Sequence, residues 1–137
     1  MFFTIWYGVY KKSTRELTYA SGGHPPALLL NEISAGASKA IPLRTLNHVI
    51  GGMPKVNYKK EKYLIGKGST LYIFSDGVYE IEKSDGSMWR FQKFTDFMNQ
   101  IQTDGRSRLD RLYQHAKNIG NQAKFGDDFT IVELAFI

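Results

Sequence analysis

The stretch that decides the fold is a strand-like run that closes with a serine, an acid and a glycine: Thr70-Leu71-Tyr72-Ile73-Phe74-Ser75-Asp76-Gly77. Its β-branched and aromatic residues are typical of a strand. Asp76 and Gly77 then end the strand, because Asp-Gly is a common turn dipeptide. An acid that directly follows an apolar strand lies at the rim of a sheet. The stretch therefore predicts a strand that brings a carboxylate to one edge of a β-structure.

Most of the chain before this stretch also has strand character. Phe2–Tyr10 is rich in β-branched and aromatic residues, and Glu16–Ala20 is the expected return strand of a hairpin. Ala27–Leu30 is a short apolar strand, whereas Asn31–Lys39 resembles a surface loop. Residues 56–65 indicate a further strand with lysines in its middle, which commonly guard an exposed sheet edge.

The period changes after residue 90. Apolar residues recur at helical spacing over Phe91–Ile101 and again after Leu109. Ser107 is placed to cap the second helix, and Gly120 is placed to end it. Phe129–Ile137 is a last strand. Because strands are grouped rather than alternating with helices, the order favours the α+β class, with an antiparallel sheet and both helices on one face.

Composition excludes several classes of protein. The chain has 137 residues, a length typical of one domain, and 42% of them are hydrophobic. With no cysteine, a disulfide scaffold, a thiolate zinc site and a cysteine nucleophile are excluded. The net charge is +5, but no nucleic-acid-binding motif accompanies it, so nucleic acid is not expected as a partner.

Two acids are the candidates for chemistry. Asp76 ends one strand, and Asp127 stands at the start of the last strand. Strand-end carboxylates that converge offer hard oxygen ligands for Mg²⁺ or Mn²⁺, and such ions activate water and neutralise phosphate. Simple turn formation is the alternative interpretation of both motifs. From the residues alone, both interpretations stay open.

Four segments have a recognisable order and spacing: Met1-Phe2-Phe3-Thr4, Leu17–Leu29 with its Gly-His-Pro loop, Gly68–Glu80, and Gly126-Asp127-Asp128-Phe129-Thr130-Ile131-Val132. Together they resemble the metal-dependent protein serine/threonine phosphatases (the PPM or type 2C family), in its bacterial SpoIIE/RsbU-like branch. The resemblance implies an antiparallel β-sandwich with flanking helices and a manganese or magnesium centre at one end. It also implies hydrolysis of phosphoserine or phosphothreonine by a metal-activated water.

The resemblance assigns roles to particular residues. In that family the acid of the Asp-Gly motif and the first acid of the closing motif bind metal, so Asp76 and Asp127 are the expected metal ligands and catalytic residues. His24, in a glycine- and proline-rich loop, either contacts phosphate or caps backbone carbonyl groups. The remaining residues expected beside the ligands are Gly77, Asp128 and Thr130.

The same resemblance implies that residues 1–137 form a single, partial domain. In the family an earlier block, with an acidic metal-binding strand, precedes the segment that matches Met1–Thr4, and the chain contains no match to it. We therefore expect the N-terminal part of the domain to be missing and metal binding to be weakened or lost. Two functions stay open: an active phosphatase, or a catalytically inactive fragment that acts as an interaction or self-association module.

The expected partners follow from the resemblance, and the expected location follows from the lack of a membrane-helix or signal-peptide pattern. In this branch the substrate is a regulatory phosphoprotein, usually an anti-sigma-factor antagonist in partner-switching signalling. No apolar run approaches the ~20 residues that a membrane helix needs, and no signal peptide is recognisable, so the expected location is cytoplasmic. A half-built sandwich would expose apolar strands or an open sheet edge, which predicts a homo-oligomer.

Overall fold

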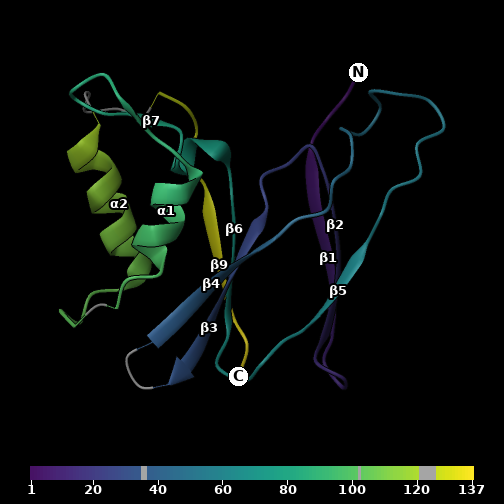
Figure 1. Ribbon diagram of the computed structural model, residues 1–137, viewed down its shortest axis with the longest axis horizontal. Helices are drawn as coiled ribbons and strands as arrows, with labels where there is room; N and C mark the ends of the chain where they lie inside the picture. Colours follow the sequence, from purple (N-terminus) through teal and green to yellow (C-terminus); the bar gives the residue numbers. More distant parts are fainter. Residues whose placement is uncertain (35–36, 102, 121–125) are drawn as a thin grey trace.

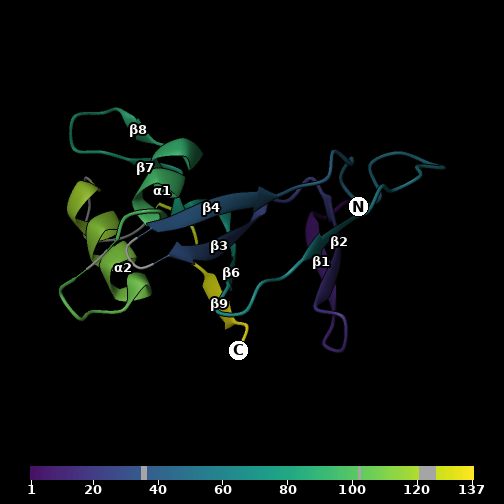
Figure 2. The same cartoon turned by 60° about the horizontal axis from the view of Figure 1, so that its bottom comes forward.

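The computed structural model describes residues 1–34, 37–101, 103–120 and 126–137. Its elements form three layers, which Figures 1 and 2 show as a pair of helices, a central sheet and a second sheet. We call the central one the helix-covered sheet and the other one the outer sheet. No helix among the described residues is long and apolar enough to cross a membrane.

The outer sheet has three strands in the order β1-β2-β5, and both pairings are antiparallel. Its strands are β1 (Ile5–Lys11), β2 (Glu16–Gly22) and β5 (Glu61–Leu64). The helix-covered sheet has four strands in the order β4-β3-β6-β9, again all antiparallel. Its strands are β3 (Ala27–Ser34), β4 (Ala37–Leu43), β6 (Thr70–Phe74) and β9 (Ile131–Ala135).

The helices cover one face of the helix-covered sheet (Figure 2). They are α1 (Phe91–Met98) and α2 (Arg108–Ile119), and a single 3₁₀ turn, η1 (Asp76–Val78), follows β6. Two short strands, β7 (Ile81–Glu82) and β8 (Met88–Trp89), pair between η1 and α1. The Ser107 hydroxyl caps α2 by accepting from the Asp110 amide at 3.0 Å, as the sequence predicts.

The core lies on both faces of the helix-covered sheet. Because neighbouring residues of a strand point to opposite faces, Leu28 packs toward the helices while Leu29 packs toward the outer sheet. Tyr72 and Leu71 divide in the same way on β6. This two-sided burial explains why β3 and β6 begin as nearly continuous apolar runs rather than alternating ones.

The structure confirms the α+β class, the antiparallel sandwich and the helices on one face. It corrects the surface loop expected at Asn31–Lys39, because β3 and β4 continue through much of that range, with Asn31 paired to Lys39 and Glu32 to Ser38. Strand pairing is made by the backbone, so polar residues at the end of a hairpin can extend it without an apolar pattern.

One further expectation is wrong in extent, because the strand expected over residues 56–65 is confined to β5. The chain turns at Asp76 and Gly77 as predicted, and η1 follows β6 there. In η1, the Asp76 carbonyl accepts from the amides of Tyr79 at 3.0 Å and Glu80 at 2.9 Å. These local bonds draw the chain into a turn at the end of β6.

Candidate metal centre

Asp76 stands where β6 leaves the core. The strand before it is anchored by the buried Tyr72 and Phe74, so its end is fixed in position. Asp76 is the first residue of η1, and its side chain is exposed to solvent. A rigid strand therefore presents a solvent-facing carboxylate at one end of the sandwich.

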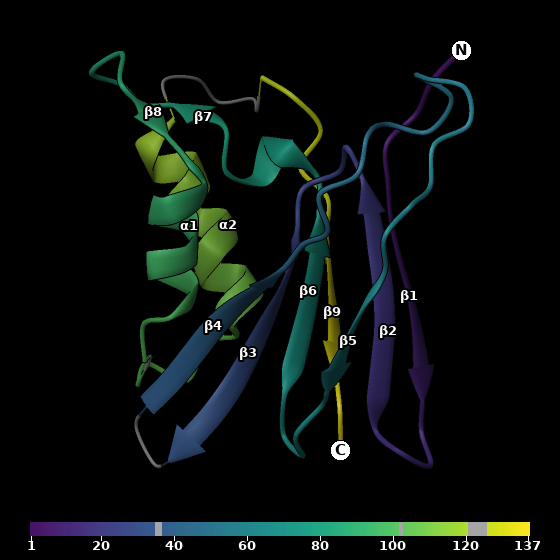
Figure 3. The same cartoon turned by 45° about the vertical axis from the view of Figure 1, so that its right-hand side comes forward.

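Asp127 and Asp128 precede β9 at the same end of the molecule. Figure 3 shows that the end of β6 lies beside the start of β9. The Asp128 amide donates to Asp127 Oδ1 at 2.7 Å. That bond orients the Asp127 carboxylate against its own backbone, and both acids stay exposed.

Ser75 ties the two acidic turns together. Its hydroxyl donates to the Asp128 carbonyl at 2.7 Å and accepts from the Thr130 amide at 3.1 Å. Its own amide donates to the Thr130 carbonyl at 2.9 Å. One side chain and one amide thus fasten the segment that carries Asp76 to the segment that carries Asp127.

Gly77 allows the two turns to touch. A methyl group in place of its α-hydrogen would overlap the Asp128 carbonyl oxygen and would lie 3.0 Å from the carbonyl carbon. Backbone on backbone leaves no flexible side chain that could move aside. Glycine is therefore required here by space, since its φ lies outside the left-handed region.

The donor set fits part of a metal site. Asp76 and Asp127 offer carboxylate oxygens, the ligand type that Mg²⁺ and Mn²⁺ prefer, and the contact between their turns puts both acids at one rim. Within the described ranges, no group of three or more His, Cys, Asp or Glu side chains is placed to hold a metal ion. The described residues thus supply two exposed carboxylates on turns that touch each other, rather than a complete shell.

Nearby charges act on Tyr79, which follows η1. Burial raises the pKa of the Tyr79 hydroxyl, the Glu80 and Asp76 carboxylates raise it further, and Arg44 opposes them. The phenol therefore stays protonated beside the acidic rim. Arg44, directly after β4, is a cation near this rim that the sequence did not indicate, because β4 itself was not predicted.

His24 contacts its own loop. Its Nδ1 lies 2.9 Å from the Pro25 carbonyl oxygen, and since a carbonyl can only accept, Nδ1 is the protonated nitrogen in this contact. This is the carbonyl-capping role described as one of the two alternatives. The structure thus brings Asp76, Gly77, Asp127, Asp128 and Thr130 together through direct backbone and hydroxyl contacts, and it shows His24 bonded within the loop between β2 and β3.

Ser75 is the residue that sequence reasoning undervalued. The hydroxyl side chain before Asp-Gly was visible, but its partners lie 53 and 55 residues away. Only the register between β6 and β9 makes the contact.

Comparison with known proteins identifies relatives of this chain. Residues 1–136 match the profile of the Stage II sporulation protein E (SpoIIE) family. The phosphoserine phosphatase RsbU of Bacillus subtilis (strain 168) is 26% identical over 136 residues, which are 98% of this chain and 39% of RsbU.

Solved structures share the fold. The phosphatase domain of the cell fate determinant SpoIIE from Bacillus subtilis superposes with a TM-score of 0.69 at 13% identity, over 97% of this chain and 58% of that one. A manganese-presoaked form of that domain gives 0.67 at 15% identity, over 97% and 56%. The SiaA-PP2C domain of Pseudomonas aeruginosa gives 0.71 at 17% identity, over 90% and 48%. The chain spans about half of each solved chain.

Proposed function

Because the chain belongs to the Stage II sporulation protein E (SpoIIE) family, we propose that it is part of a metal-dependent protein serine/threonine phosphatase domain. Residues 1–137 form one unit of that domain, with Asp76 and Asp127 as ligands to Mn²⁺ or Mg²⁺. The contact between their two turns, made by Ser75 on the Asp128 carbonyl at 2.7 Å, is the observation that carries the proposal.

The chain's own residues prepare the site for an anionic substrate. Asp76 and Asp127 would hold the ion at a solvent-exposed rim that a phosphorylated side chain can reach. Ser75 and Gly77 hold the backbones of the two turns against each other. The bound ion supplies activation of water and neutralisation of phosphoryl charge.

The substrate proposed is a regulatory phosphoprotein. RsbU is named a phosphoserine phosphatase, which supports phosphoserine as the group hydrolysed here. The resemblance to the SpoIIE/RsbU branch supports an anti-sigma-factor antagonist in a cytoplasmic partner-switching system as the phosphoprotein.

A second candidate is a catalytically inactive module that binds a partner or a second copy of itself. It is favoured by the two-carboxylate site and by the open apolar edge of the sandwich, where Val132 and Leu134 are 48% and 44% exposed. Static light scattering tests self-association. A monodisperse monomer would contradict the oligomer.

Calorimetric titration of the chain with Mn²⁺ tests the proposed site. We expect weak but saturable binding, since the described residues offer two carboxylates. Asp76→Asn and Asp127→Asn should each abolish it, because each removes one of two anionic ligands. Asp96→Asn is the matched control, since Asp96 is also exposed but lies on α1, and it should bind as the wild type does. Manganese affinity retained in both site variants would refute the assignment.

Turnover tests the activity itself. Mn²⁺-dependent release of phosphate from a phosphoserine peptide is expected to disappear in Asp76→Asn and Asp127→Asn. Binding without turnover would favour the inactive module.

A further inference from the structure

The segment between β4 and β5 is held in a defined shape by its own side chains. Asn47, near its start, accepts from the Lys59 amide and donates to the Lys59 carbonyl, at 2.8 Å each. An amide side chain that bonds a backbone in both directions imitates a hydrogen-bonded pair of strand residues. The Tyr58 hydroxyl adds a bond to the Val49 carbonyl at 3.1 Å. We call residues 44–60 the arm.

The arm is anchored where it leaves β4. Thr45 and Ser21 are 5% and 2% exposed, and they bond each other reciprocally. The Ser21 amide donates to Thr45 Oγ1 at 2.7 Å, and the Thr45 amide donates to Ser21 Oγ at 3.1 Å. Arg44 lies between the buried Leu43 and Thr45, so its exposed side chain starts from a fixed backbone.

The arm stands at the same end of the molecule as the rim that carries Asp76 and Asp127. Figures 1 and 3 show the loop between β4 and β5 at the end where β6 passes into η1. Pro42 of β4 and Tyr72 of β6 pair with the same residue of β3, so they lie in one row across the sheet. Two residues further along each strand, the next row on that face holds Arg44 and the last residue of β6. Arg44 thus enters the arm at the level of the strand end that carries Asp76.

The arm is strongly basic. Residues 44–60 contain four cations and no acid: Arg44, Lys55, Lys59 and Lys60. All four are exposed, and none forms an ion pair with another described residue. The next acid along the chain, Glu61, accepts from the Tyr19 hydroxyl at 3.1 Å. The positive charge of the arm is therefore available to a partner.

Apolar side chains also project from the arm. Leu46 is 86% exposed and Met53 is 55% exposed. Exposed apolar groups that polar residues surround mark sites of interaction, and methionine and arginine are enriched at protein interfaces. The arm thus has the composition of a surface that binds another protein.

We infer that the arm is the docking surface for the phosphoprotein substrate, and that it selects an acidic one, whose aspartate and glutamate side chains pair with the cations of the arm while its phosphoserine lies at the rim. The inference rests on the proposed function, since it takes the rim as the place of hydrolysis. Complementary charge steers association and excludes wrong partners. The fixed shape of the arm lowers the cost of ordering it on binding.

A continuous anionic surface fits the arm less well than an acidic protein does. Asp76, Glu80, Asp127 and Asp128 are all exposed at the neighbouring rim. A membrane or a nucleic acid that covered the arm would bring its phosphates against these acids, and like charges placed together are costly. A protein can place its acidic side chains on the arm alone.

Fluorescence anisotropy of labelled peptides tests the docking surface. The probe is a phosphoserine peptide with aspartates on both sides of the phosphoserine, and the matched peptide has asparagines at those positions. Both are titrated with the full chain in metal-free buffer. We expect the aspartate peptide to bind about tenfold more tightly, because several exposed ion pairs together contribute that much. The difference should shrink as salt is raised, since salt screens exposed charges.

Two double variants assign this preference to the arm. Lys59→Glu/Lys60→Glu should remove it, because two of the four cations are reversed. Lys11→Glu/Lys12→Glu is the matched control and should keep it. The control changes the net charge equally, but its lysines lie where β1 turns into β2, at the opposite end of the outer sheet (Figure 3). All four lysines are exposed, so both variants are expected to fold.

Four results would overturn the inference. The first two are equal affinity for both peptides and a preference that survives in the Lys59→Glu/Lys60→Glu variant. The third is an equal loss in the Lys11→Glu/Lys12→Glu variant, which would assign the preference to net charge. The fourth is tighter binding to phosphatidylglycerol vesicles or duplex DNA than to the aspartate peptide, which would assign the arm to a lipid surface or a nucleic acid.

The docking test is independent of the test of the proposed phosphatase activity. None of its readouts involves Mn²⁺ or release of phosphate. Loss of the acid preference with Mn²⁺-dependent turnover intact would refute the docking surface alone. An intact preference without metal binding would refute the metal centre alone.

Discussion

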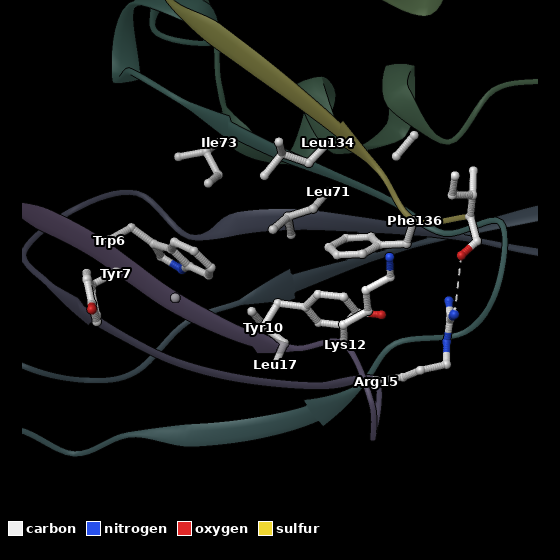
Figure 4. Close-up of a pocket in the computed structure, with 13 residues that line it drawn as sticks. Trp6, Tyr7, Tyr10, Lys12, Arg15, Leu17, Leu71, Ile73, Leu134 and Phe136 are labelled. Atoms are coloured by element: carbon white, nitrogen blue, oxygen red, sulfur yellow. Dashed lines mark hydrogen bonds between the residues drawn. The ribbon is translucent and has the colours of Figure 1, made fainter.

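The two faces of the helix-covered sheet are formed by the same strands, but they differ in how completely they are covered. Toward the helices, Tyr72 and Phe74 are buried under α1, and Phe94 meets Phe74 edge-on with ring centroids 4.8 Å apart. Toward the outer sheet, Ile73 and Leu134 line a cavity of about 700 Å³ between the two sheets, which we call the slot (Figure 4). The face toward the outer sheet is thus buried at Leu29 and Leu71 but becomes exposed toward β9, where Leu134 is 44% exposed.

The largest expected difference in stability is between two leucine-to-alanine variants, one on each side of the helix-covered sheet. Leu112→Ala removes a side chain of α2 with 0% exposure from the core between the helices and the sheet, and we expect it to lower the free energy of unfolding by about 2–5 kcal/mol. Leu134→Ala removes the same atoms from a residue that is 44% exposed in the slot, and should cost less than about 1 kcal/mol. Denaturant unfolding measures both, and equal costs would show that the slot is a packed core.

A second pair of variants tests how β9 is held at the edge of the slot. Gly77→Ala would push a methyl group into the Asp128 carbonyl, and we expect a loss of about 1–3 kcal/mol from overpacking. Manganese affinity should also fall, because the two acidic turns separate. Gly126→Ala is the control: nothing lies within 4 Å of its added methyl group, so its effect should stay within about 0.5 kcal/mol. Identical stability of the two variants would rule out the close approach.

The smallest expected effect is the pH dependence of stability that His115 contributes on the helix-covered side. His115 stacks on Phe97 with ring centroids 4.6 Å apart, and burial lowers its pKa from the usual 6.5. The folded protein thus favours the neutral ring, so its contribution is present above about pH 6.5 and is lost as pH falls through the lower folded pKa. Comparing unfolding of the wild type and His115→Gln between pH 5 and about 7.5 isolates this term. A wild-type profile as flat as that of the variant would contradict it.

Local signals in the sequence were sufficient for the elements that carry them. The β6 run and the Ser107 cap of α2 are both specified by neighbouring residues, so both could be predicted. The β3–β4 hairpin could not, because its far end is polar and is held by backbone pairing, with Asn31 opposite Lys39.

In the candidate site, too, some residues could be predicted from local motifs and others could not. Asp76 and Asp127 were found because each stands in a short recognisable motif. The fastening by Ser75 depends on the register of β6 against β9, and the reason for Gly77 is a backbone 51 residues further along the chain at Asp128. The hydrogen bonds of Arg15, which lines the slot, likewise need Ile65 and Ile137 to be brought to it. Contacts between residues so far apart in the sequence leave no local pattern from which they could be predicted.

The edge strands β1 and β9 have one further consequence, for topology. They run in the same direction along the slot (Figure 3). One antiparallel strand added to each edge would give two new strands that also run alike, and such strands cannot be joined by a tight turn. They need a crossover connection of about a dozen residues or more. A polypeptide that completes both sheets in this way therefore has to leave the sandwich and return to it, rather than enter as a single hairpin.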